Sequence, residues 1–91
     1  MSEGMQVLII DDEIQIRRFL RISLEANGYR VHETATGQDG ILKTAQLRPD
    51  IIILDMGLPD MDGLDVLKRL REWTETPVII LSVRDSDRDK V

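Results

Sequence analysis

The sequence predicts an open, doubly wound α/β fold built on a parallel sheet. Short apolar runs alternate with helical patterns along a chain of only 91 residues, which is enough for one small domain. Repeated strand–helix–strand units require right-handed crossovers, and these place successive strands parallel to one another. Most of the apolar runs consist of Ile, Leu and Val with little polar alternation, which is typical of strands covered on both faces.

The expected strands are the four apolar runs, Met5–Ile10, Arg30–Ala35, Ile51–Leu54 and Val78–Leu81. The run at Arg30–Ala35 alternates polar and apolar residues, so it suits an edge of the sheet. The run at Val78–Leu81 is apolar throughout, and we expect it to leave an edge that is open to pairing with another chain.

The first expected helix, Glu13–Asn27, carries Ile16, Leu20 and Leu24 at a four-residue spacing. This spacing places the three side chains on one face, toward the sheet. The helix is expected to end at Gly28, because glycine tolerates the left-handed conformation that closes a helix.

The second expected helix, Gly37–Leu47, has a start signal and a stop signal. Thr36 is a candidate N-cap with Asp39 three residues later, and Pro49 cannot continue a helix.

The third expected helix is Leu64–Trp73, and its leucine spacing predicts that Leu64, Leu67 and Leu70 face inward. Pro77 then separates this helix from the fourth strand.

Composition excludes several classes of function. The sequence has no cysteine and a single histidine, so disulfide frameworks, thiolate zinc sites and multi-histidine metal sites are excluded. The net charge of −5 argues against binding nucleic acid through a basic face. No apolar run approaches the roughly 20 residues of a membrane span, and the first residues do not resemble a secretory signal. A cytoplasmic protein with no membrane contact is therefore expected. The single histidine, His32, is expected to be a surface or edge residue.

Three acidic residues and one serine lie directly after the expected strands. Asp11 and Asp12 follow the first run, Asp55 follows the third, and Ser82 follows the fourth. In parallel sheets ligands bind beyond the carboxyl ends of the strands, so these side chains are expected to converge on one rim. A lone acid at such a position is often only a helix cap or a solvated loop residue. Three together suit Mg²⁺, which prefers oxygen ligands, and an aspartate beside it can serve as a nucleophile toward phosphorus.

At these residues the chain resembles the receiver domain of two-component response regulators. The motifs Val7–Glu13, Pro49–Gly63 and Pro77–Ser82 match that family in order, spacing and strand context, and the resemblance extends from Met5 to Val91. Within the family, the chain is similar to the potassium-responsive, Kdp-type regulators of the winged-helix OmpR/PhoB class. The segments that carry this finer similarity are Gly57–Gly63, Leu70–Trp73, Ser82–Arg84 and Asp89–Val91.

The resemblance implies a role for each residue of the rim. Asp55 matches the phosphate-accepting aspartate, and Ser82 matches the hydroxyl that senses the phosphoryl group. Asp12 matches a direct Mg²⁺ ligand, Asp11 a ligand acting largely through water, and Gly57 a ligand through its main-chain carbonyl. The implied function is transfer of a phosphoryl group from a sensor histidine kinase to Asp55 in transcription control, in a signalling domain that is not an enzyme.

The resemblance also implies a flavodoxin-like (CheY-like) fold with strand order 2-1-3-4. The family has a fifth strand bearing a lysine, which this sequence lacks, and Lys90 lies too early to replace it. We therefore expect a fold truncated after strand 4, with residues 1–4 as a flexible lead-in and residues 5–91 as the N-terminal part of a receiver. DNA would be bound only by a C-terminal domain that this chain does not include, and phosphorylation is expected to be impaired.

Two surfaces are candidates for partners. The exposed face of the first helix resembles the surface that docks on the kinase, with residues such as Ile14, Arg17, Arg18 and Arg21; a merely solvated basic face is the alternative. A homodimer is also possible, including one formed through the edge of the fourth strand.

Other functions were weighed against the receiver. A pseudo-receiver that binds partners without phosphorylation remains an alternative. An aspartate-nucleophile phosphatase needs a second acid two residues after the nucleophile, where Gly57 stands. A calcium-binding EF-hand loop around Gly63 would need acids at Leu58 and Arg69, and it is rejected. In the receiver, Gly63 is expected to allow a backbone conformation that bulkier residues cannot adopt.

Overall fold

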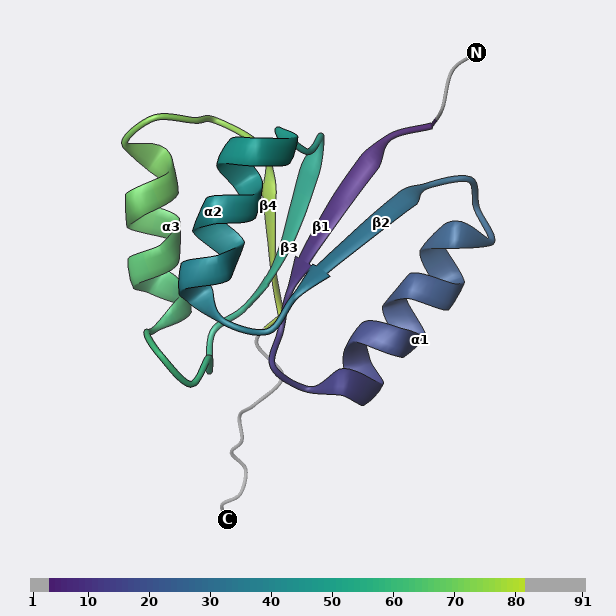
Figure 1. Cartoon of the computed structure of the whole chain (residues 1–91), viewed down its shortest axis with the longest axis horizontal. Coiled ribbons are helices and arrows are strands. Elements are labelled where there is room, and N and C mark those ends of the chain that lie inside the picture. Colours follow the sequence, from purple (N-terminus) through teal and green to yellow (C-terminus); the bar gives the residue numbers. More distant parts are fainter. Residues whose placement is uncertain (1–3, 82–91) are drawn as a thin grey trace.

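A parallel four-stranded sheet forms the centre of the molecule, in the order β2-β1-β3-β4. The computed structural model describes residues 4–81. The strands are β1 (Gln6–Ile10), β2 (Arg30–Thr34), β3 (Ile51–Asp55) and β4 (Val78–Leu81), and the helices are α1 (Ile14–Glu25), α2 (Gly37–Leu47) and α3 (Gly63–Arg71). Figure 1 shows α1 on one side of the sheet and α2 and α3 on the other. The predicted fold and strand order are confirmed.

The signals at the helix ends explain the observed boundaries. The Thr36 hydroxyl accepts a hydrogen bond from the Asp39 N–H at 3.1 Å, so α2 begins where its cap predicts. Gly28 adopts a φ of +89° after α1, in the left-handed region expected of it. The remaining predicted boundaries lie within two residues of the observed ones, as is usual at the ends of helices and strands.

The core consists of two apolar layers, one on each face of the sheet. Leu8, Ile10 and Ile52 pack against the side of α2 and α3, whereas Val7 and Ile9 pack against the side of α1. Neighbouring residues of one strand thus enter opposite layers, because side chains alternate across a sheet. β1 and β3 are buried on both faces, as their unbroken apolar sequences predict.

The prediction that Leu64 faces the core is wrong. Leu64 is 55% exposed, whereas Val66 and Leu70 are fully buried. Val66 and Leu70 are four residues apart and share one face of α3, and Leu64 lies two residues, or about 200° of helical rotation, from Val66. Leu67 packs partly against the core, as expected.

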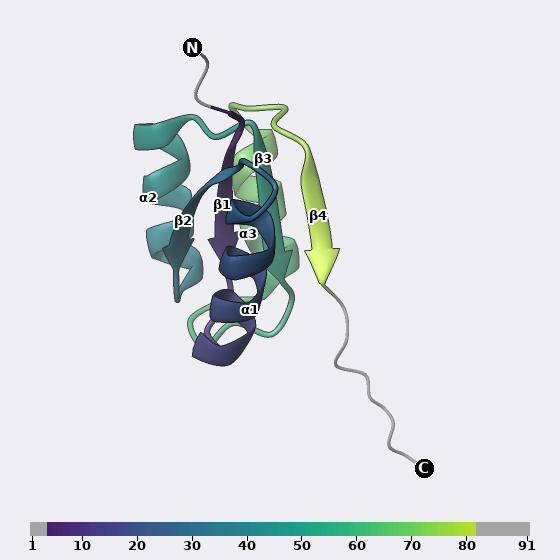
Figure 2. The same ribbon diagram turned by 90° about the vertical axis from the view of Figure 1, so that its right-hand side faces the viewer.

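β4 is less covered than its apolar sequence suggests. Val78 and Leu81 pack against the two core layers, but Ile79 is 49% exposed and Ile80 is 38% exposed. Figure 2 shows β4 at one margin of the sheet and β2 at the other. Within residues 4–81, β4 pairs only with β3, so the expected apolar edge is present.

Within residues 4–81, no helix combines the length and the hydropathy needed to cross a membrane. His32 lies on the edge strand β2, half-buried, with Nε2 at 2.8 Å from Oε1 of Gln6. The prediction of an edge position for His32 is confirmed.

Candidate acidic site at the carboxyl edge of the sheet

Three carboxylates meet where β1 and β3 end. Ile10 of β1 is paired in register with Leu54 of β3, so the residues that follow, Asp11 and Asp55, extend side by side. One carboxylate oxygen each from Asp11, Asp12 and Asp55 lies within 4.8 Å of the others. The expected convergence of these three acids is therefore observed, whereas Ser82 lies outside the described residues, as does Lys90.

Two of the three acids are shielded from water. Asp11 and Asp55 are each 3% exposed, and Asp12 is exposed. Burial raises the pKa of Asp11; the Glu13 N–H, which donates to Asp11 Oδ1 at 2.8 Å, lowers it, and the charges of Asp55 and Asp12 raise it further. The pKa of Asp11 thus lies above its ordinary value, because burial and the neighbouring carboxylates both disfavour its charged form.

The acids open onto a cavity with mixed walls. The cavity has a volume of about 410 Å³, and Asp11, Glu13 and Asp55 form its polar wall. Its remaining walls are apolar, and they come from Ile16, Phe19, Leu20 and Leu81. The cavity therefore leaves space for a small ligand beside Asp55.

The loop between β3 and α3 folds back beside Asp55. Gly57 is exposed and forms an antiparallel bridge with Asp62, and the Gly63 N–H donates to the Met56 carbonyl at 3.0 Å. A Cβ atom on Gly63 would lie 2.7 Å from the carbonyl oxygen of Asp55. The expectation that Gly63 needs a special backbone conformation is wrong, because its φ is not positive. Glycine is required there by the close approach of the chain to Asp55.

Asp60, on the same loop, binds the start of α2. Its carboxylate accepts the N–H groups of Gly37 and Gln38 at 2.8 and 2.9 Å. The contact of Asp60 with α2 was not predicted, because it joins segments more than twenty residues apart. The loop that follows Asp55 is thereby tied to a second helix.

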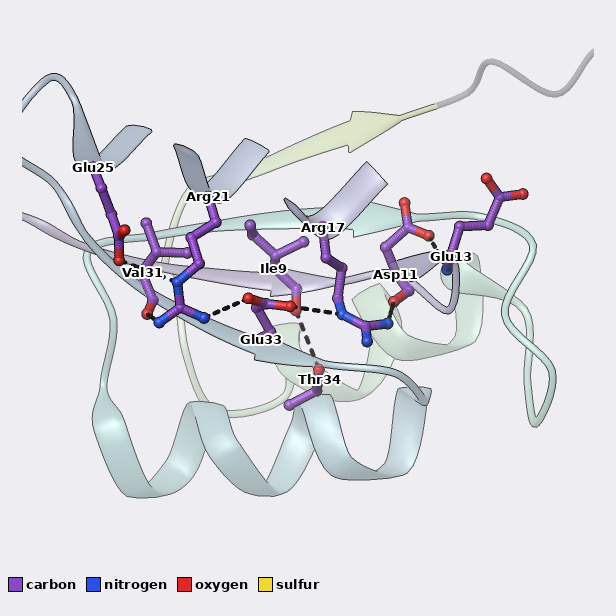
Figure 3. A network of polar contacts seen from close by, with 9 residues as sticks. All are labelled: Ile9, Asp11, Glu13, Arg17, Arg21, Glu25, Val31, Glu33 and Thr34. Carbon is purple, nitrogen blue, oxygen red and sulfur yellow. Dashed lines mark hydrogen bonds and ion pairs between the residues drawn. The ribbon is translucent and has the colours of Figure 1, made fainter. Parts of the chain in front are cut away.

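An ion-pair network joins α1 to β2 beside the site (Figure 3). Glu33 lies between two arginines: Arg17 Nε donates to one carboxylate oxygen at 2.8 Å, and Arg21 Nη1 donates to the other. Arg17 Nη1 also donates to the main-chain oxygen of Asp11 at 2.7 Å. Glu33 was not predicted to matter, although two arginines four residues apart on one helix face do indicate an acidic partner.

Because of this network, Arg17 and Arg21 are less available on the expected docking face of α1 than predicted. The Arg17 side chain is only 15% exposed and that of Arg21 is 42% exposed, since both turn toward Glu33. Ile14 and Arg18 are exposed, as expected.

The donor set of the acidic cluster fits a hard cation. All three groups offer carboxylate oxygens, which suit Mg²⁺ better than softer metals. Oxygens on opposite sides of one Mg²⁺ stand about 4.2 Å apart, at roughly 2.1 Å each from the ion. The three carboxylate oxygens lie within 4.8 Å of one another, a separation that a single Mg²⁺ can bridge.

The sheet order and the acids at its carboxyl edge define a receiver-type signalling domain. The chain belongs to the response regulator receiver domain family, whose sequence model matches residues 7–91. The resemblance drawn from the three motifs is thereby confirmed.

Curated relatives support the finer similarity. The chain is 53% identical over 85 residues to the KDP operon transcriptional regulatory protein KdpE of Escherichia coli, with 93% of this chain and 38% of that protein covered. The same identity and coverage hold for KdpE of Mycobacterium tuberculosis. AfsQ1 of Streptomyces coelicolor is 41% identical over 85 residues. The chain thus spans 38% of the length of these relatives.

Solved structures share the fold. The receiver domain of the Francisella response regulator 1452 superposes with a TM-score of 0.85 at 34% identity, covering 96% of this chain and 73% of that one. The chemotaxis protein CheY4 of Vibrio cholerae gives a TM-score of 0.84 at 32% identity, covering 91% and 72%.

Proposed function

We propose that Asp55 accepts a phosphoryl group from the phosphohistidine of a sensor kinase, in a site that Mg²⁺ completes. The observation that carries the proposal is the convergence of Asp11, Asp12 and Asp55 at the end of adjacent parallel strands. The family membership supports the same assignment.

Asp55 is placed to act as the nucleophile. Its carboxylate ends β3, is 3% exposed and faces the cavity. A carboxylate oxygen attacks phosphorus, the bond from phosphorus to the histidine nitrogen breaks, and the nitrogen leaves with the electron pair. A mixed anhydride, aspartyl phosphate, results.

Asp11 and Asp12 would hold Mg²⁺, which supplies positive charge next to the phosphoryl oxygens. Asp12 would bind it directly, Asp11 through water, and Gly57 through its main-chain carbonyl. Ser82 would bond the transferred phosphoryl group, so that its hydroxyl reports phosphorylation. The described loop supports the assignment of Gly57, because the Gly57–Asp62 bridge and the Gly63 contact keep it next to Asp55.

We propose a sensor histidine kinase as the partner, with docking on α1. Ile14 is 53% exposed and Arg18 is exposed, so both remain available for contact. Phe19 and Ile22 are 68% and 67% exposed on the same helix and extend this surface. The domain would act in the cytoplasm as a signalling module rather than an enzyme, within a regulator of the Kdp-type, potassium-responsive kind.

A second copy of the chain is the other proposed partner, through the margin of β4. Ile79 and Ile80 are exposed there, and an apolar strand edge favours pairing. Light scattering over a range of concentrations tests this pairing. A mass that stays monomeric at high concentration would refute it.

Beryllofluoride, which mimics a phosphoryl group on an aspartate, tests the proposed function. With Mg²⁺ present, we expect amide NMR shifts at Asp11, Asp12 and the loop that follows Asp55. Asp55→Asn should abolish the response, whereas Asp39→Asn, which removes an equal charge from α2, should keep it. A beryllofluoride response that persists in Asp55→Asn would contradict the assignment of Asp55.

A further inference from the structure

Arg17 contacts the acidic site through the main chain rather than through a carboxylate. Its Nη1 donates to the carbonyl oxygen of Asp11 at 2.7 Å, while its Nε donates to Glu33 at 2.8 Å (Figure 3). The Arg17 side chain is 15% exposed, so water competes weakly for these bonds. The guanidinium therefore bridges β2 and the segment that follows β1.

The carbonyl that Arg17 binds belongs to the peptide unit between Asp11 and Asp12. That unit is planar, so the direction of the carbonyl sets the direction in which the chain enters Asp12. On its other side, Asp11 donates its N–H to the Thr34 carbonyl at 3.1 Å. Asp11 lies beyond the last register pair of β1 with β3, Ile10 and Leu54. The Arg17 side chain thus holds the carbonyl side of Asp11, beyond the last residue pair of β1 with β3.

Glu33 fixes the orientation of the Arg17 guanidinium. The guanidinium is a rigid planar fork, and a bond from Nε to Glu33 fixes the plane in which Nη1 points. Arg21 shares Glu33 but donates to the Val31 carbonyl at 3.4 Å, and it has no bond to Asp11 among the contacts of residues 4–81. Arg17 therefore contacts the main chain of Asp11, and Arg21 does not.

We infer that Arg17 is a positioning residue for the cation site: it holds the Asp11–Asp12 peptide so that both carboxylates face the same ion. The inference rests on the proposed function of Asp11 and Asp12 as cation ligands. It adds a residue on α1 that touches neither the ion nor the phosphoryl group.

A Mg²⁺ titration of paired variants tests the inference. Arg17→Ala should weaken Mg²⁺ binding by about 10-fold, the lower end of what removing an outer-shell partner of a metal ligand costs. Arg21→Ala breaks the same network at Glu33 and should leave the affinity near that of the wild type. Arg17→Lys, with one compact head group, cannot serve both Glu33 and the carbonyl and should fall between the two.

A metal-free measurement separates positioning from general loss of stability. The Asp11 carbonyl ¹³C and Asp12 amide ¹⁵N shifts should change in Arg17→Ala and in Arg17→Lys, but not in Arg21→Ala. Equal Mg²⁺ affinity in Arg17→Ala, Arg17→Lys and the wild type, or an equal loss in Arg21→Ala, would overturn the inference. A wild-type chain that binds no Mg²⁺ would instead overturn the proposed function, and this inference with it.

Discussion

At the scale of single residues, Asp60 shows how the loop that follows Asp55 is anchored. Its carboxylate accepts two N–H groups at the start of α2, from Gly37 and Gln38. The first N–H groups of a helix have no partner within the helix, and the positive end of the helix dipole attracts an anion. Asp60 thus caps a helix from a distant loop and holds the chain that follows Asp55.

Replacing Asp60 should produce a stability change that depends on pH. The N–H groups of Gln38 and then Gly37 lower the pKa of Asp60 below 3.8. Because the pKa of the folded state is depressed, the stabilisation is present above the unfolded pKa and is lost as pH falls through the folded pKa. Asp60→Asn should therefore melt at a lower temperature than the wild type at neutral pH, with the difference shrinking in acid.

Thermal melting from about pH 3 to about pH 7 measures this effect. Asp39→Asn is the matched control, because Asp39 lies in the first turn of α2 and its carboxylate accepts no N–H group from residues 4–81. An equal and pH-independent loss in both variants would contradict the role of Asp60.

Glu33 is the second residue whose charge should stabilise the fold. Burial alone would raise the pKa of Glu33, but hydrogen bonds from Arg17 and Arg21 outweigh burial and place the pKa below 4.5. Glu33→Gln should lower the free energy of unfolding by about 1–3 kcal/mol at neutral pH, the usual loss for a bond to a charged group. The difference should vanish as pH falls through the lowered pKa.

Urea unfolding at neutral and acid pH checks the prediction for Glu33. Glu25→Gln is the control, because Glu25 forms only an exposed pair with Arg21 four residues away, of the kind that contributes about 0.3–0.5 kcal/mol. If both variants lose the same stability, the position of Glu33 between two arginines has no special importance.

The acidic site could be predicted from the sequence at some residues and not at others. Asp11, Asp12 and Asp55 each follow an apolar run, and parallel strands bring their carboxyl ends together. Asp60 and the main-chain contact of Arg17 depend on how loops and side chains pack across the fold. Sequence spacing has no information on such contacts.

At the scale of elements, α3 shows which face of a helix carries stability. Val66 and Leu70 are fully buried, whereas Leu64 is 55% exposed. Leu70→Ala should lower the free energy of unfolding by about 2–5 kcal/mol, because it leaves a cavity between α3 and the sheet. Leu64→Ala should change it by less than about 0.5 kcal/mol.

Chemical denaturation of these two variants compares equal chemical changes at an exposed and a buried position of one helix. A loss for Leu64→Ala as large as that for Leu70→Ala would mean that Leu64 faces the core, as its leucine spacing predicted. That prediction failed because Leu64 and Leu67 fit a three-residue spacing as well as Val66 and Leu70 fit a four-residue one. By contrast, α2 has a cap at Thr36 and a stop at Pro49, and its bounds were predicted correctly.

At the scale of the whole molecule, the three carboxylates at the acidic edge destabilise the folded state. Folding brings three carboxylates within 4.8 Å and leaves two of them 3% exposed. Buried like charges destabilise a folded state, and functional sites commonly retain such a cost. A bound cation would reverse the cost, so stability and cation binding should be coupled across the molecule.

Melting with Mg²⁺ and with a chelator tests this coupling. Mg²⁺ at a hundredfold excess over its dissociation constant should stabilise the wild type by about 2.7 kcal/mol. Burial raises the pKa of Asp11 above 3.8, so the stability of the metal-free fold should fall as pH rises through that pKa. Asp11→Asn keeps an oxygen that can accept the Glu13 N–H but carries no charge.

Asp11→Asn should therefore melt at a higher temperature than the wild type when metal is chelated, and gain less from Mg²⁺. Asp39→Asn, outside the cluster, should respond to Mg²⁺ as the wild type does. A metal-free Asp11→Asn chain less stable than the wild type would show that Asp11 acts mainly as a structural cap for the turn at Glu13. A metal-free Asp11→Asn chain that is more stable than the wild type would mean that the fold holds these carboxylates together against their repulsion. A bound cation would relieve that repulsion.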